Sequence, residues 1–207
     1  MLRRKVKDYY FYKAKREHYA ARSVYKLKEA NEKYKFLHRR GVVLDLGCFP
    51  GSWLQYCAEA VGPQGFVLGI DRQELKSLPG PNTRSLQADV LALDPEEIKK
   101  IRNAFDVVLS DMAPQTSGVK IVDHMKSIEL ARAAFLIAKE LLRTGGTLFV
   151  KVFQGEDLAA FKKEVEQAFA QVRFFKPKGS RPESKEVFIL ASNKRPERKD
   201  ALLIVSQ

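Results

Sequence analysis

Apolar stretches alternate along this chain with stretches whose apolar positions recur at helical spacing. Seven segments between residues 42 and 191 are largely apolar, and several are typical of strands buried on both faces of a parallel sheet. We predict strands at residues 42–47, 66–71, 84–89, 105–111, 146–153, 172–175 and 186–191. We predict helices at residues 52–61, 95–103, 124–142 and 157–170, with Ser52, Asp94 and Asp157 as N-caps and Gly145-Gly146 ending the third helix. This alternation predicts a doubly wound α/β sandwich around a central, mostly parallel sheet.

A glycine-bearing turn follows the first predicted strand. It reads Asp45-Leu46-Gly47-Cys48-Phe49-Pro50-Gly51-Ser52-Trp53 and leads directly into a predicted helix. A strand, a glycine turn and a helix N-terminus in this order predict a ligand site at the carboxyl edge of a parallel sheet. Bulkier residues replace the second glycine of the dinucleotide pattern G-x-G-x-x-G, and the acidic Asp45 suits a cationic ligand better than a pyrophosphate. The turn therefore favours S-adenosylmethionine over NAD, with an ordinary Gly-Pro turn as the remaining alternative.

Three aspartates lie at the ends of successive predicted strands. Asp71 ends the second strand, Asp89 the third and Asp111 the fourth. Each alone is a common turn residue, but together they follow the glycine turn at the edge where a site is expected. A carboxylate at the second strand end can accept hydrogen bonds from both ribose hydroxyls of an adenosine, and one at the third can bind the adenine amino group.

The net charge of +12 is unevenly distributed. Residues 1–40 carry 14 Lys and Arg against 4 acidic residues, residues 41–172 carry 14 against 17, and residues 173–207 carry 9 against 4. Six of the seven tyrosines lie in the first segment, where we expect Tyr25 and Tyr34 to pack against the domain. Cations beside rings that stack on bases are typical of a nucleic-acid contact. The candidate nucleic-acid-binding residues are Arg3, Arg4, Lys5, Lys7, Lys13, Lys15 and Arg16.

The length of the chain favours one domain. With 207 residues, 45% of them hydrophobic, it can form one substantial core. We expect a basic, nucleic-acid-binding arm at residues 1–20 without a clear apolar face, one domain at 21–193 and a tail of unassigned role at 194–207. No apolar run reaches the ~20 residues of a membrane helix and no signal core follows the N-terminus, so we expect a cytoplasmic protein with no membrane partner. Two cysteines nine positions apart and three scattered histidines predict no disulfide framework and no metal site.

Two lysines require an explanation. Lys151 lies within the apolar stretch Leu148-Phe149-Val150-Lys151-Val152-Phe153, where a buried ammonium is costly unless it is paired or deprotonated. An exposed strand edge is the alternative to a functional role. Lys26 lies near the start of a further expected helix that Ser23 would cap, and alone it would pass as a surface lysine.

Five motifs in unbroken order resemble one known family. They are Arg22-Ser23-x-Tyr25-Lys26-Leu27, the turn at residues 45–53, Ser110-Asp111-Met112-Ala113-Pro114, Lys151 in its apolar strand, and Arg181-x-x-x-Lys185-Glu186-Val187. Together, over residues ~8–193, the chain resembles the FtsJ-like ribosomal RNA 2′-O-ribose methyltransferases of the large-subunit type. The chain departs from the family turn at Cys48, Phe49 and Ser52, where alanines and a second glycine are usual.

The resemblance implies a Rossmann-like methyltransferase fold that uses S-adenosylmethionine, with a seven-stranded sheet and helices on both faces. It implies a catalytic tetrad of Lys26, Asp111, Lys151 and Glu186. It implies cofactor contacts at Gly51, Trp53, Asp71, Asp89 and Asp111, to which the turn itself adds Asp45 and Gly47 as candidates. A ribose 2′-hydroxyl is a weak acid, so a base must take its proton as it attacks the methyl group. Lysine has an ordinary pKa of about 10.4, and we expect apolar walls and the charge of Lys26 to lower the pKa of Lys151.

Three function classes remain open from the sequence. The first is an RNA ribose methyltransferase, acting on a uridine of 23S ribosomal RNA either free or in the assembled large subunit, or alternatively on transfer RNA or a messenger cap. A small-molecule methyltransferase would leave the basic arm without a role, and a silent RNA-binding module would leave the tetrad without one. We expect the first class, and a monomer that requires no metal.

Overall fold

The computed structural model describes residues 2–180 and 184–196, and the side chains of these ranges from residue 9 onward. The helices are α1 (Leu2–Arg16), α2 (Val24–Tyr34), α3 (Ser52–Val61), α4 (Pro95–Lys99), α5 (Lys120–Leu141) and α6 (Leu158–Ala168). The strands are β1 (Val42–Leu46), β2 (Phe66–Asp71), β3 (Thr83–Gln87), β4 (Phe105–Ser110), β5 (Leu142–Phe153), β6 (Phe169–Phe175) and β7 (Glu186–Lys194).

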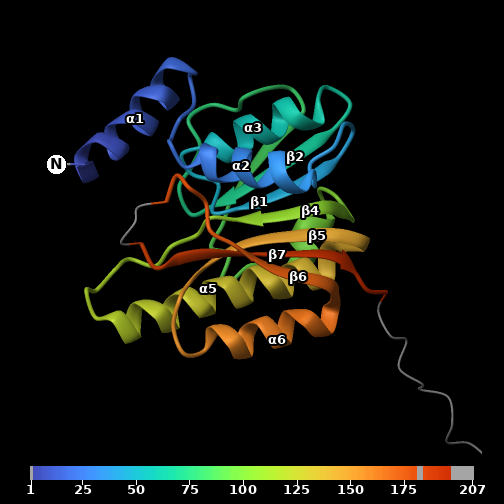
Figure 1. Ribbon diagram of the computed structural model, residues 1–207. Helices are drawn as coiled ribbons and strands as arrows, with labels where there is room; N and C mark the ends of the chain where they lie inside the picture. Colours follow the sequence, from blue (N-terminus) through green and yellow to red (C-terminus); the bar gives the residue numbers. More distant parts are fainter. Residues whose placement is uncertain (1, 181–183, 197–207) are drawn as a thin grey trace, which may run out of the picture.

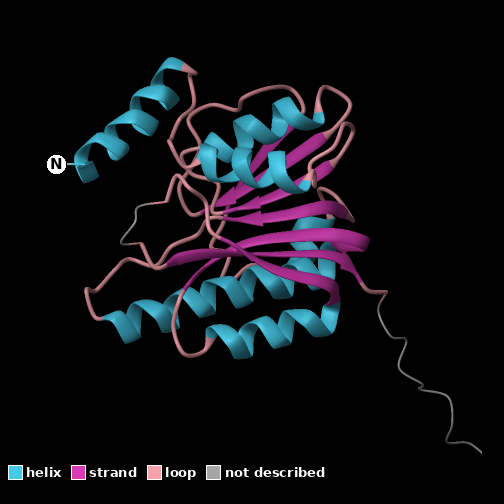
Figure 2. Cartoon of the chain, viewed as in Figure 1, coloured by secondary structure: helices cyan, strands magenta, loops and turns pink. Residues whose placement is uncertain are grey.

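One seven-stranded sheet forms the centre of the molecule. Its strand order is β3-β2-β1-β4-β5-β7-β6, and the first five strands are mutually parallel. β7 runs antiparallel between β5 and β6. Figure 2 shows the strands as one continuous twisted layer between helices. The predicted mostly parallel, seven-stranded α/β fold is confirmed.

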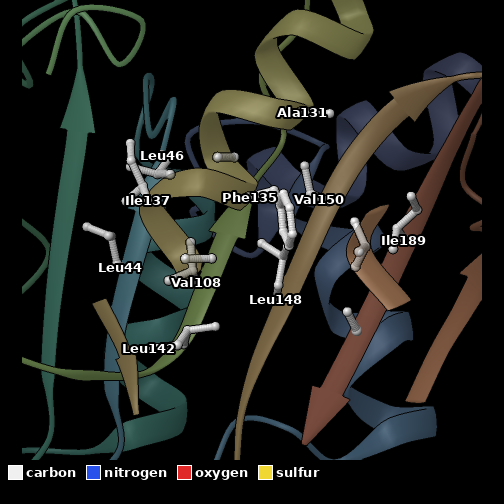
Figure 3. Close-up of a cluster of buried hydrophobic side chains, with 14 of the residues drawn as sticks. Leu44, Leu46, Val108, Ala131, Phe135, Ile137, Leu142, Leu148, Val150 and Ile189 are labelled. Carbon is white, nitrogen blue, oxygen red and sulfur yellow. The ribbon is translucent and has the colours of Figure 1, made fainter. Parts of the chain in front are cut away.

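Helices cover both faces of the sheet, as predicted. α2 and α3 lie on one face, and α5 and α6 on the other (Figure 1). The larger core cluster fills the α5 and α6 side, where Phe135 of α5 packs against Val150 of β5 and neighbouring residues (Figure 3). The second cluster lies beneath α2 and α3 and includes Trp53, stacked on Phe149 with ring centroids 5.8 Å apart. Both faces of β5 are thus buried, which explains its continuous apolar sequence.

α1 lies outside the two groups of helices that cover the sheet, beside the edge of the sheet at which β1 and β4 end (Figure 1). Residues 1–20 lack a clear apolar face, yet Leu2–Arg16 forms a helix. The helix forms with a short contact at its C-terminal end, where Ala14 packs with Val24 and Tyr25. The expected packing of Tyr25 and Tyr34 against the domain is confirmed, since Tyr34 meets Phe175 edge-on at 5.8 Å. No helix among the described residues is long and apolar enough to cross a membrane.

Several predicted boundaries are wrong for identifiable reasons. α5 ends at Leu141, and Gly145-Gly146 lie inside β5, where the register with β4 shifts between Phe105 and Val107. The glycine pair forms an irregularity of the strand rather than the helix stop that we predicted. β3 ends at Gln87, so Asp89 lies beyond the strand instead of ending it.

The predicted helix caps were partly right. Asp94 accepts a hydrogen bond from the Glu96 N–H and is an N-cap as predicted. Ser52 is the first residue of α3, and Gly51 occupies its N-cap position. Asp157 and Ser23 occupy cap positions but make no side-chain cap bond. The Oγ of Ser23 instead lies 3.0 Å from the Oγ of Ser52, which joins α2 to α3.

Candidate active site

Four charged side chains from distant parts of the chain meet at the carboxyl edge of the sheet. Lys151 Nζ lies 2.8 Å from Asp111 Oδ1, and Lys26 Nζ lies 3.5 Å from the same oxygen. Lys26 Nζ also donates to Glu186 Oε2 over 2.9 Å. The four residues named from the sequence as a tetrad therefore form one continuous chain of ion pairs. Their side chains are only 6% to 16% exposed.

The sheet and α2 bring these side chains together. Lys151 pairs with Phe188 in the β5–β7 ladder, and Glu186 begins β7 two positions away. Asp111 directly follows β4, which pairs with β5. Side chains two positions apart share a face of a strand, so Lys151 projects on the side of Phe149, which α2 covers. Lys26, in the first turn of α2, reaches that face with its Nζ 5.7 Å from the centroid of the Phe188 ring.

Asp111 connects the two lysines. Burial acts to raise its pKa, but the charges and hydrogen bonds of Lys151 and Lys26 outweigh this and hold the pKa of Asp111 below its ordinary value. The Nζ of Lys151 also donates to the backbone carbonyl of Asp111. Two contacts to one residue fix the position of the Lys151 amine.

Ser180 is a contributor that the sequence did not reveal. Its buried hydroxyl donates to Glu186 Oε1 over 2.6 Å, while the other carboxylate oxygen binds Lys26. Ser180 lies in a segment without periodicity, six positions before Glu186, so no sequence pattern marks it.

A hollow of about 250 Å³ opens beside Lys26 and Glu186. We call it the Lys26 hollow, and its lining consists of Arg22, Ser23, Lys26, Gly179, Ser184 and Glu186. It gives a bound molecule access to one end of the ion-pair chain from solvent.

The glycine turn has the geometry that its sequence requires. Gly47 and Gly51 adopt positive φ values of 77° and 104°. A side chain at Gly47 would collide with Met112, since a Cβ there would lie 2.3 Å from Met112 Cγ, whereas a Cβ at Gly51 would meet only Leu75 at 3.6 Å. Gly47 thus makes room for the Asp111–Met112 segment, and Gly51 leaves open space beside the turn.

Asp71 ends β2 as predicted and stabilises the glycine turn through a hydrogen bond. Its two carboxylate oxygens accept hydrogen bonds from the backbone N–H groups of Phe49, at 3.0 Å, and Gln73, at 2.8 Å. A second hollow, the Asp71 hollow, has a volume of about 120 Å³. It is lined by Cys48, Asp71, Gln73, Glu74, Leu75, Ser85, Leu86 and Gln87. Pockets for drug-sized ligands enclose about 300–1,000 Å³, so this hollow has room for one part of such a ligand.

The other predicted ligand residues differ in exposure. Asp45 lies in β1 and is 1% exposed, and its Oδ2 has no hydrogen-bond partner within the described part of the chain. Trp53 is buried in the core, and its Nε1 donates to the Ser23 carbonyl at 2.9 Å. Asp89 is exposed, accepts from the Leu91 N–H and lies 3.8 Å from Arg72 Nε. The structure therefore groups Asp45, Gly47, Gly51, Asp71 and Asp111 along one edge, with Trp53 beneath it and Asp89 outside.

The predicted RNA-binding cations lie on α1. Lys15 and Arg16 are exposed, while Lys13 is half-buried, with its Nζ 4.7 Å from the centroid of the Tyr25 ring. The side chains of Arg3, Arg4, Lys5 and Lys7 lie outside the described residues. The described part of α1 also exposes three aromatic rings, those of Tyr9, Phe11 and Tyr12. Cations and exposed rings thus occur together on this helix.

Comparisons with known proteins show similarity to methyltransferases over most of the chain. The model of the FtsJ-like methyltransferase family matches residues 19–194. "Ribosomal RNA large subunit methyltransferase E" of Desulfosudis oleivorans is 45% identical over 192 residues, which cover 93% of each chain. The protein of the same name from Methanococcus vannielii is 41% identical over 197 residues, covering 93% of this chain and 75% of that one. A crystal structure of a ribosomal RNA methyltransferase from Plasmodium falciparum superimposes with a TM-score of 0.77 at 29% identity, covering 86% of this chain and all of that one.

Proposed function

Because the chain belongs to the FtsJ-like methyltransferase family, we propose that it methylates the 2′-hydroxyl of a ribose in large-subunit ribosomal RNA with S-adenosylmethionine as methyl donor. The target nucleotide in this proposal is a uridine of 23S ribosomal RNA. The observation that carries the chemistry is the convergence of Lys26, Asp111, Lys151 and Glu186.

The residues at the edge of the sheet fit this methyl donor. An unpartnered buried carboxyl oxygen of Asp45 and the Asp71 carboxylate suit a ligand that carries positive charge and ribose hydroxyls. When bound, the donor supplies a methyl group on a positively charged sulfonium. Asp71 would accept hydrogen bonds from the ribose, because each of its oxygens retains accepting capacity beyond its one backbone donor. Gly47, Gly51 and Asp111 would line the remaining edge, Asp89 would bind the adenine amino group, and Trp53 would support the turn from the core.

Lys151 is the general base of the proposed reaction. Its amine must be neutral to accept the proton of the ribose hydroxyl, and Asp111 orients it through two contacts. Glu186, held by Ser180, positions Lys26. The positive charge of Lys26 stabilises the developing negative charge on the ribose oxygen. Alignment of the hydroxyl with the methyl group supplies much of the acceleration, because effective molarities contribute about 7–11 kcal/mol.

The Lys26 hollow is where the acceptor ribose would lie. It adjoins two members of the tetrad, and Arg22 on its wall can pair with a phosphate. α1 would contact the RNA outside this hollow through its cations and exposed rings. The arm of residues 1–20 would then bind RNA, and residues 21–193 would carry the chemistry. An enzyme that acts on ribosomal RNA works where ribosomes are made, and we place it in the cytoplasm as a monomer.

Transfer RNA and messenger caps present the same ribose hydroxyl, so the tetrad does not distinguish them. The names of the relatives favour large-subunit ribosomal RNA. A small-molecule acceptor would leave the cations and rings of α1 without a role.

The test is transfer of a labelled methyl group from S-adenosylmethionine. The acceptors are large ribosomal subunits and free ribosomal RNA that lack the modification, transfer RNA, capped messenger RNA and a small-molecule panel. We expect label in large-subunit RNA, mapped to one ribose 2′-oxygen, and strongly reduced incorporation with the Lys151→Ala variant. Label on a base, or only on a small molecule, would overturn the proposal. Comparison of free RNA with assembled subunits identifies the form of the substrate.

A further inference from the structure

The carboxyl group of Asp45 is buried without a counter-charge. It lies in β1, paired in register with Gly69 of β2 and Leu109 of β4, and it is 1% exposed. Its Oδ2 reaches neither solvent nor any hydrogen-bond partner among the described residues. A buried polar group of this kind usually has a partner, and an orphan at a ligand site points to a group that the ligand supplies.

The groups around Asp45 do not offer it a cation. The neighbouring carboxylates are Asp71, at the end of β2, and Asp111, after β4, and both act on Asp45 with negative charge. Lys26 of α2 and Lys151 of β5 are engaged with Asp111. The thiols of Cys48 and of Cys57 on α3 stay neutral, because burial raises the pKa of each. Burial first, and then Asp111 and Asp71, raise the pKa of Asp45 itself to about 8.

We propose that Asp45 is a neutral acid in the empty site and releases its proton to solvent when a cationic methyl donor binds, leaving a carboxylate that counters the positive charge of the ligand. The inference rests on the proposed function. In this step the O–H bond of Asp45 breaks, the proton passes to water or buffer, and no electron is transferred. The gain in attraction to a nearby cation in a buried site offsets the cost of ionising the acid.

Two cations of S-adenosylmethionine can fill this role. One is the sulfonium, which the product S-adenosylhomocysteine lacks, and the other is the α-ammonium, which donor and product share. Comparison of the two ligands distinguishes these sources. If the sulfonium is the partner, Asp45 favours the donor over the product and so aids product release.

Calorimetry measures the proton directly. Titration of the full chain with S-adenosylmethionine near pH 7, in two buffers with different ionisation enthalpies, gives the number of protons released. We expect a value close to one per site. We also expect the affinity to rise about tenfold per pH unit below the pKa of Asp45 and to level off above it. Binding with no proton release and constant affinity from about pH 6 to about pH 9 would overturn the inference.

A matched pair of variants identifies the group that releases the proton. Asp45→Asn should abolish the release and flatten the pH dependence, whereas Asp94→Asn, which changes an exposed acid at the N-cap of α4 outside the proposed site, should keep both. Proton release that persists in Asp45→Asn would transfer the role to another group and refute the inference. Should Asp45→Asn fail to fold, infrared difference spectra of the wild-type protein replace it, and the carbonyl band of a protonated carboxyl group should disappear on addition of the donor. Failure to bind S-adenosylmethionine at any pH would instead contradict the proposed function.

Discussion

Ser180 and Lys26 bind opposite oxygens of the same carboxylate. The Ser180 hydroxyl donates to Glu186 Oε1 at 2.6 Å, and the Lys26 ammonium donates to Oε2 at 2.9 Å. With both oxygens engaged, rotation of Glu186 or its movement away from Lys26 would break a hydrogen bond. Ser180 is therefore a positioning residue for the end of the ion-pair chain.

Replacement of Ser180 by alanine should lower kcat while leaving affinity for S-adenosylmethionine and RNA nearly unchanged. A hydrogen bond to a charged group contributes about 1.5–3 kcal/mol, so we expect a loss of about tenfold or more. Ser180→Thr keeps the hydroxyl and should restore most of the activity. Ser192→Ala, at the far end of β7, serves as the control. Steady-state kinetics in which KM rises and kcat does not fall would assign Ser180 to substrate binding instead.

Lys151→Ala should reduce kcat by about 10²–10⁴, the usual contribution of a general base, with little effect on affinity for S-adenosylmethionine. Lys151→Arg is the sharper variant, because a guanidinium can keep the ion pair with Asp111 but cannot act as a base at neutral pH. Single-turnover methyl transfer measures both, with the exposed Lys139→Ala as control. A variant that retains more than about a tenth of the wild-type rate would remove Lys151 from the role of base.

Asp71→Ala should weaken binding of S-adenosylmethionine about tenfold or more, since a charged hydrogen-bond partner contributes about 1.5–3 kcal/mol. The structure adds a second expected effect, because Asp71 also holds the Phe49 N–H of the turn. Asp71→Asn retains an acceptor for the turn and should preserve thermal stability better than the alanine variant. Calorimetry and thermal unfolding separate the two effects. Unchanged affinity in both variants would refute the ribose assignment.

The regular elements of the fold could be predicted because their signals are local. The strand at residues 66–71 and the helix at 52–61 match the structure at both ends. A continuous apolar run predicts a strand buried on both faces, and apolar residues at helical spacing predict a helix, so both signals are local. The helix end predicted at Gly145-Gly146 was wrong because a glycine pair occurs both at helix ends and at strand irregularities.

The tetrad was found through motif resemblance and not through periodicity. Lys151 alone stood out as a charge in an apolar strand, and Lys26 had no local signal of its own. Contacts that exist only in the folded chain could not be predicted from the sequence. The collision that excludes a side chain at Gly47 involves Met112, and the bond that fixes Glu186 involves Ser180. Neither partner is identified by spacing.

The packing of α1 determines where the arm can be removed. Ala14 is buried against Val24 and Tyr25, and the Ala20 N–H donates to the Gln55 side chain. Deletion of residues 1–20, the predicted arm, should therefore lower the melting temperature. Deletion of residues 1–8 should leave the melting temperature near the wild-type value and raise the KM for RNA. It should also weaken the salt dependence of RNA binding, because the slope of log K against log[salt] falls by about 0.7–0.9 for each phosphate that the shortened protein no longer neutralises. Tyr12→Ala, which removes a ring that is 64% exposed, should weaken RNA binding without a change in slope.

Filter binding at several salt concentrations and thermal unfolding measure these effects. If the protein lacking residues 1–8 binds RNA with an unchanged slope, α1 is structural, and the phosphate-binding surface must lie elsewhere, with the basic residues near Lys176 and Lys178 as the next candidates.

Asp45→Asn should stabilise the ligand-free protein increasingly as the pH rises. The pKa of Asp45 is about 8 in the folded protein, against about 4 in an unfolded chain. Between these values the folded state holds a proton that the unfolded state has lost, so the Asp45 contribution to stability falls as the pH rises. Asparagine resembles the neutral acid and does not titrate. The melting temperature of the variant minus that of the wild type should grow from about pH 5 to about pH 8, and a constant difference would contradict the raised pKa.

The position of β7 in the sheet determines at which stage of synthesis the site can be complete. It is the last strand that the structure describes, yet it lies inside the sheet, between β5 and β6, and it supplies Glu186. While the chain is being synthesised, β5 has an unpaired edge until β7 emerges, and such an edge invites pairing with other chains. A polypeptide that stops short of β7 would retain the glycine turn, Lys26, Asp111 and Lys151 but lack the strand that closes the site. The site can therefore be complete only after β7 has been translated and has paired with β5.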